Sequence, residues 1–146
     1  VAVRAADQAE RTISFYTDQR SRKWLEICRD DRVALLFVDP KARVQVRASG
    51  RAEFAKPTES LAAWSGQSAK QKEPYSSGVS PGRPLKFCEE ILATPSLTPC
   101  EAGENFCVVR VKLEVIDWLD LVVGVPSRRA RFLYKDGSAD SYWIAP

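Results

Sequence analysis

The chain has 146 residues, 45% apolar and 28% charged, which suffices for one globular domain with a hydrophobic core. Its formal net charge of +3 is too small to indicate a nucleic-acid-binding protein, which gathers a stronger basic bias on one face. The absence of histidine excludes Ser-His and Cys-His nucleophile pairs and argues against a zinc site.

The predicted elements follow one another in a mostly β order. Alternation of apolar and polar residues predicts strands, and Gly, Pro and Asp mark the turns between them. The predicted strands are residues 1–4, 11–16, two within 32–54, 106–121, 130–134 and 141–145, with turns at 5–10, 39–41 and 135–137. The predicted helices are a short one after residue 21, residues 57–66 and residues 85–94, and residues 70–84 are predicted as a long loop. These elements indicate a small, mostly antiparallel barrel with peripheral helices.

Composition also bears on the compartment and on the extent of the chain. No run approaches the ~18 consecutive apolar residues of a membrane helix, and the N-terminus lacks the features of a signal peptide, so we expect a cytoplasmic protein. The four cysteines form no CxxC pair and are expected to be reduced and mostly buried. Methionine is absent, even at position 1. We therefore interpret the chain as a fragment lacking its N-terminal segment, or as one in which methionines have been substituted.

Three cations crowd the predicted start of the first helix. The segment FYTDQRSRK ends a strand and leads into this helix, with Asp18 or Ser21 as its expected cap. Arg20, Arg22 and Lys23 lie where acidic residues are normally favoured, because a helix N-terminus carries partial positive charge. A hydroxyl, backbone N–H groups and cations at one place bind phosphate without a glycine-rich loop. The alternative is a solvated basic turn.

Two further places carry candidate ligand contacts. Gln45 lies on the polar face of a predicted hairpin, and its amide suits the edge of a heterocycle such as a flavin, because it both donates and accepts. The alternative is a solvated strand position. The second place is Trp118, which precedes a cluster formed by Arg128, Arg129 and Arg131. The alternative interpretation is a core tryptophan followed by solvated arginines.

Taken together, FYTDQRSRK, VQVRASGRAEF and the C-terminal order W, RFLY and WIAP resemble the pyridoxamine 5′-phosphate oxidase-like family over nearly the whole chain. These proteins are FMN-binding split β-barrel flavoproteins. The resemblance implies a mainly β fold with inserted helices, a six-stranded antiparallel split β-barrel in which residues 1–146 form a single FMN-binding domain. It also implies a homodimer with FMN at the subunit interface, and an FMN-dependent oxidoreductase of unknown small-molecule substrate. No metal, nucleic acid or membrane partner is expected.

The resemblance assigns the expected FMN contacts. Arg22 and Lys23, with Ser21 beside them, match the pair that holds the FMN phosphate, and Gln45 matches a glutamine that reaches the isoalloxazine. Other positions match the flavin-side strand ends, a Gln-Ser pair near the phosphate, and contacts from the second subunit. The full expected set is Arg4, Tyr16, Thr17, Ser21, Arg22, Lys23, Gln45, Gln67, Ser68, Trp118 and Arg131.

Departures from the family pattern bear on the substrate. Residues 56–75 replace, in shortened form, the segment that grips the substrate phosphate in oxidase members, and the histidine before the final arginine is missing. Either the Gln67–Ser68 pair or the turn at residues 80–82 fits the place beside the flavin. These departures argue against vitamin B6 phosphate as the substrate.

Two other functions remain as alternatives. The first is a non-catalytic module that binds FMN or another anionic cofactor, for example F420. The second is a nucleic-acid-binding barrel that uses Arg43, Arg47 and Arg51, against which the low net charge argues.

Overall fold

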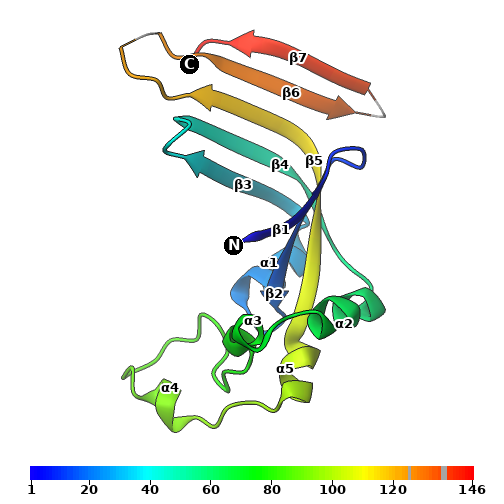
Figure 1. The fold of residues 1–146 in the computed structure, drawn as a ribbon, viewed down its shortest axis with the longest axis vertical. Coiled ribbons are helices and arrows are strands. Elements are labelled where there is room, and N and C mark those ends of the chain that lie inside the picture. The colour runs from blue at the N-terminus through cyan, green and yellow to red at the C-terminus, as the bar shows by residue number, and fades with distance from the viewer. Residues whose placement is uncertain (125, 136–137) are drawn as a thin grey trace.

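An antiparallel β-sheet with short helices gathered at one end forms the protein (Figure 1). The computed structural model describes residues 1–124, 126–135 and 138–146. The described strands are β1 (Val3–Asp7), β2 (Thr12–Asp18), β3 (Arg32–Asp39), β4 (Val44–Phe54), β5 (Phe106–Asp120), β6 (Arg129–Lys135) and β7 (Ser138–Ile144). The described helices are α1 (Arg22–Arg29), α2 (Pro57–Ser65), α3 (Ala69–Lys72), the 3-10 helix η1 (Glu73–Tyr75), α4 (Glu90–Ala93) and α5 (Pro99–Asn105).

The long strand β5 organises the sheet. One of its edges pairs with β4, which in turn pairs with β3. Its other edge pairs with β2 over its first half and with β6 over its second half. The strand therefore belongs to two half-sheets, one ending in β1 and the other ending in β7, and Figure 1 shows it bending as it passes from one to the other.

The change of partner along β5 coincides with an irregularity in its pairing. The register with β4 shifts between Ser49 and Gly50, which makes Glu114 an extra residue on β5. A Cβ atom at Gly50 would lie 1.9 Å from the carbonyl oxygen of Lys112, so a side chain at this position does not fit. The bulge thus depends on glycine, as close approaches of two backbones often do.

Two hydrophobic clusters cover the opposite faces of the sheet, since adjacent residues of a strand point to opposite sides. One cluster packs α1 against the sheet and contains Phe15, Ile27, Ala48, Ala52, Val109, Val111 and Leu113. The other packs α2 and α5 against the sheet and contains Ala55, Trp64, Ala102, Phe106 and Val108. The sheet therefore carries α1 on one face and α2 with α5 on the other.

The mainly β split-barrel class is confirmed, and each predicted strand is present. The described residues form seven strands, which match the seven segments predicted from alternation, whereas the family resemblance implied six. The first strand reaches Asp7, so the turn is shorter than predicted. Asp136 and Gly137 of the predicted last turn lie outside the described residues.

The segment between α2 and β5 differs most from the prediction. The predicted loop at 70–84 begins with α3 and η1, and the predicted helix at 85–94 is reduced to α4. Thr94 precedes a proline and takes an extended conformation, which ends the helix. Sequence periodicity missed α5, whose seven residues are too few to show it, although a Thr98–Glu101 capping box marks its start.

The prediction that the cysteines are mostly buried is wrong. All four are free thiols, but Cys28, Cys88 and Cys100 are exposed and only Cys107 is buried. The helix α1 is short and buries Ile27 alone, which leaves the neighbouring Cys28 at the surface. In the part of the chain that the structure describes, no helix is long and apolar enough to cross a membrane.

Candidate functional site

The start of α1 is a helix N-terminus with open donors. Ser21 takes an extended conformation and caps the helix, accepting a hydrogen bond from the amide of Trp24 at 3.3 Å. The first turn contains no acidic residue. The amides of Arg22 and Lys23 have no acceptor within the helix, as at any helix start, and so are available to a ligand.

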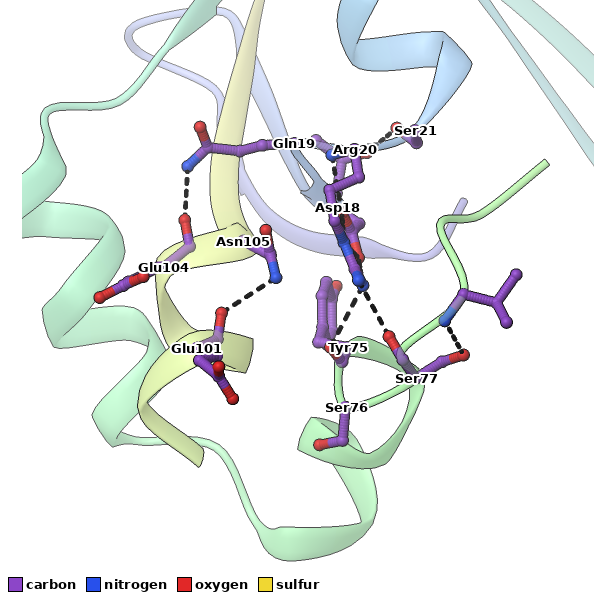
Figure 2. A network of polar contacts seen from close by, with 12 residues as sticks. Asp18, Gln19, Arg20, Ser21, Tyr75, Ser76, Ser77, Glu101, Glu104 and Asn105 are labelled. Carbon is purple, nitrogen blue, oxygen red and sulfur yellow. Dashed lines mark hydrogen bonds and ion pairs between the residues drawn. The ribbon is translucent and has the colours of Figure 1, made fainter. Parts of the chain in front are cut away.

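Arg20 is already paired within the protein. Its guanidinium donates to both oxygens of the buried Asp18 carboxylate, and its other donors reach the carbonyls of Tyr75 and Ser77. Figure 2 shows this side chain extended from the start of α1 to the segment after η1. The pKa of Arg20 is raised, chiefly by its hydrogen bond with Asp18. Arg20 therefore serves the fold rather than a ligand.

The other two cations differ from each other. Arg22 is exposed and forms an ion pair with Glu26 on the next turn, with Nε 2.8 Å from Oε1. Lys23 is half-buried, and its Nζ lies 3.4 Å from Oγ1 of Thr17, which in turn lies 3.2 Å from Oγ of Ser21. Burial lowers the pKa of Lys23. An ammonium and two hydroxyls thus meet at one point.

A groove of about 330 Å³ opens beside Lys23, between α1, β3 and the N-terminal residue. Its acidic residues are already neutralised, because Glu26 pairs with Arg22 and Asp30 pairs with Arg32. Among the described residues, no carboxylate forms an ion pair with Lys23. The groove therefore carries an uncompensated positive charge, as an anion site requires.

Arg4 and Tyr16 form a second contact, on the face of the sheet opposite α1. The guanidinium of Arg4 lies 5.2 Å from the centre of the Tyr16 ring, a cation–π geometry. The edge of the Tyr16 ring packs against Phe106, which fixes its orientation in the second hydrophobic cluster. Both residues line a pocket of about 390 Å³ between the β1–β2 hairpin and α2.

Gln45 and Arg131 lie on one face of the second half-sheet, which we call the outer face. Register places Gln45 opposite Leu119 and places Arg131 opposite Asp117, and these two β5 residues point to the same side. Trp118 points to the other side, where it contacts Trp143 and Arg128. The structure therefore separates Trp118 from Arg131 within one chain, although both were expected in the same contact set.

Gln67 and Ser68 form the junction of α2 and α3. The amide of Gln67 donates to the carbonyl of Ala63, and the Ser68 hydroxyl donates to the side chain of Gln71, which caps α3. Both polar groups thus have local structural partners. The alternative turn at residues 80–82 contains Gly82 in a left-handed conformation and no residue of the site above.

Sequence reasoning missed one prominent group, the carboxylate of Asp117. It is buried on the outer face and binds both Arg129 and Arg131. An acidic residue inside the otherwise apolar run at residues 115–119, followed by an arginine cluster, was the available signal. Among the described residues, no group of three or more acidic or cysteine side chains is placed to hold a metal.

A sequence profile for the family described as pyridoxamine 5′-phosphate oxidase matches residues 1–85, more than half of the chain. The chain belongs to the pyridoxamine 5′-phosphate oxidase family. The matched region contains β1 to β4, α1 and the whole Lys23 groove. No curated protein matches the chain.

Two solved structures share the fold of this pyridoxamine 5′-phosphate oxidase family member. A pyridoxamine 5′-phosphate oxidase-related, FMN-binding protein of Nostoc punctiforme superposes with a TM-score of 0.79 at 22% identity, covering 99% of this chain and 78% of that one. PhzG of Burkholderia lata, solved in complex with tetrahydrophenazine-1-carboxylic acid, gives 0.78 at 19% identity, covering 100% and 73%. At these identities the likeness shows the split-barrel fold.

Proposed function

We propose that the protein is an FMN-binding flavoprotein whose FMN phosphate binds at the start of α1. Membership of the family and the FMN-binding description of the Nostoc relative support the cofactor. The observation that carries the proposal is the half-buried Lys23, which has hydroxyl neighbours but forms no ion pair with a carboxylate of the described chain. Its Nζ lies 5.5 Å from the centre of the Phe15 ring and 3.4 Å from the Thr17 hydroxyl, so a bound anion would supply the charged partner that the ammonium lacks.

The donors beside Lys23 fit a phosphate monoester. The ammonium, the hydroxyls of Thr17 and Ser21, and the free amides of the first turn of α1 supply both charge and directed hydrogen bonds. Arg22 would join them only by leaving Glu26, a surface pair that costs little to break. Lys23 is therefore assigned the main role and Arg22 a secondary one.

The remaining expected contacts are divided between the two parts of the cofactor. Arg4 and Tyr16 on the β1–β2 hairpin and Gln45 on the outer face would orient the flavin ring. Gln67 and Ser68 after α2 would lie on the phosphate side. Trp118 and Arg131 would come from the second subunit, where they lie on opposite faces of its sheet.

Bound FMN supplies hydride transfer, and the protein supplies orientation and electrostatics. Arginine side chains near the ring, Arg4 and Arg131, would stabilise negative charge on the reduced cofactor. We therefore propose an FMN-dependent oxidoreductase. Because PhzG binds tetrahydrophenazine-1-carboxylic acid, flat ring carboxylic acids are the first substrates to test, ahead of vitamin B6 phosphate.

A homodimer with FMN at its interface is proposed on the same basis. Leu36 and Val38 of β3 are 62% and 55% exposed, and register places them on the outer face with Arg47 and Gln45. Exposed apolar residues that share one sheet face favour a partner surface. Sedimentation of the wild type against Leu36→Arg tests this proposal, with a dimer expected for the wild type and a monomer for the variant.

The shortened segment at residues 56–75 favours a second candidate, a module that binds FMN or F420 without turnover. Anaerobic mixing of the loaded protein with nicotinamide donors and candidate substrates separates the two. Bleaching of the flavin band supports the oxidoreductase, and a flavin that none of them reduces supports the carrier.

The FMN proposal itself is tested by titrating purified protein with FMN and following flavin fluorescence. We expect Lys23→Ala to weaken binding by about tenfold or more, equivalent to about 1.4 kcal/mol. Lys70→Ala, which removes an exposed lysine of α3, serves as the control and should bind like the wild type. A wild type that does not bind FMN, or equal affinity in all three proteins, would overturn the proposal.

A further inference from the structure

One buried carboxylate organises the arginines of the outer face. Asp117 is 9% exposed and lies on β5, between β4 and β6. Arg129 approaches it with a two-point fork, Nε to Oδ1 at 2.7 Å and Nη2 to Oδ2 at 2.7 Å. Arg131 donates from Nη2 to Oδ2 at 2.9 Å. A single side chain thus holds two guanidinium groups at a fixed spacing.

The cluster keeps an excess of positive charge. Arg47 of β4 lies opposite Asp117 in the β4–β5 pairing, and among the described residues it forms no ion pair. The three arginines and Asp117 line a pocket of about 220 Å³ with Ser49, on the same face as Gln45. Two positive charges therefore remain after Asp117 is counted.

Burial of Asp117 has a cost that its contacts must offset. Removing a carboxylate from water is unfavourable unless it is paired and hydrogen-bonded, and the fork supplies both. The Arg129 hydrogen bond, followed by that of Arg131, lowers the pKa of Asp117 to about 2, so it stays ionised at every working pH. The pairing also fixes the rotamers of two long side chains that would otherwise move.

We infer that Asp117 is a positioning residue, which fixes Arg129 and Arg131 on the outer face and through them sets the interaction of this arginine cluster with a bound flavin. Only the effect on the bound flavin rests on the proposed FMN function. The fixed geometry of the two arginines is a property of the chain alone.

The first test uses FMN-free protein labelled with ¹⁵N-arginine. Locked guanidinium groups give sharp, dispersed Nε–H signals, which Arg129→Lys and Arg131→Lys assign. We expect Asp117→Asn to merge these two signals with those of mobile arginines. Asp120→Asn is the matched control, since Asp120 is also buried on β5 but pairs with Arg128. Unchanged Arg129 and Arg131 signals in Asp117→Asn would overturn the inference.

The second test measures FMN affinity in a double-variant cycle. We expect Asp117→Asn and Arg131→Lys each to raise the Kd about tenfold, and the double variant to be no weaker than Asp117→Asn alone, because Asp117 acts through Arg131 and Arg129. Multiplying effects would contradict this. Failure of the wild type to bind FMN would overturn the proposed function but leave the NMR result to decide the positioning role. If Asp117→Asn does not fold, Asp117→Glu replaces it, and sharp signals at shifted positions are expected.

Discussion

Arg20 and Asp18 form a two-point ion pair beneath the start of α1, with Nε 3.0 Å from Oδ1 and Nη2 2.6 Å from Oδ2. The same guanidinium donates from Nη1 to the carbonyl of Ser77, 57 positions further along the chain, at 2.9 Å (Figure 2). The pair therefore joins the Lys23 region to the irregular segment that follows η1.

Removing Arg20 should loosen that segment. Arg20→Ala leaves the buried Asp18 without its partner and two carbonyls without donors, so we expect a loss of about 2–3 kcal/mol of unfolding free energy. Urea denaturation measures the loss, and limited proteolysis should show faster cleavage within residues 76–98. Arg22→Ala breaks only an exposed pair and should cost less than about 0.5 kcal/mol. Equal losses for the two variants would contradict this account of Arg20.

The bulge at Gly50 gives a second prediction. Gly50→Ala forces a Cβ atom against the carbonyl of Lys112 and should cost more than about 2 kcal/mol, because neither backbone moves freely within the sheet. In Gly66→Ala the nearest atom to the new Cβ lies 3.7 Å away, so its stability should stay within about 0.5 kcal/mol of the wild type. Thermal or urea unfolding of the two variants provides the comparison.

Lys23 makes apo-protein stability depend on pH in the alkaline range. Its pKa in the folded protein is lowered by burial from 10.5, so between these two values the unfolded chain binds more protons than the folded one. The Lys23 contribution to stability therefore rises as pH increases through this window. The unfolding free energy of the wild type, measured against Lys23→Gln from neutral pH to about 10, should rise. A flat difference would mean that Lys23 is fully solvated.

Thiol reactivity should separate the cysteines into two classes. Cys28, Cys88 and Cys100 are exposed and should react rapidly with a disulfide reagent in the native protein. Cys107 is buried, and burial raises its pKa, so it should react only when the protein unfolds. Counting the protein thiols that react before and after denaturant is added checks this. Fast reaction of Cys107 would place it at the surface.

Local signals in the sequence were sufficient for much of the site. The change from strand to helix spacing and the capping serine located the start of α1, and Ser21 is its cap. Local signals did not show which cation is left over for an anion, because the partners of Arg20 at Tyr75 and Ser77 are remote in sequence. The same distance hid the role of Asp117, whose arginines belong to another strand.

Irregular backbone explains the remaining differences. Alternation predicted β5 well, but the extra residue at Glu114 shifts the phase in the second half of the strand, which contains Trp118 and pairs with Arg131 of β6. Between α2 and β5 the helices are too short to show a period, and their ends depend on capping and on proline. The periodicity of the sequence therefore could not define the structure between Gln67 and β5.

The central place of β5 has a consequence for how the chain acquires its structure. β2 and β4 are not paired with each other, and each finds its inner neighbour only in a strand that begins at Phe106. On the ribosome, the first 105 residues would emerge with apolar strand edges still unpaired. Joining them requires the closure of long loops, which slows folding, so the nascent chain would be open to aggregation until residues 106–120 have been synthesised.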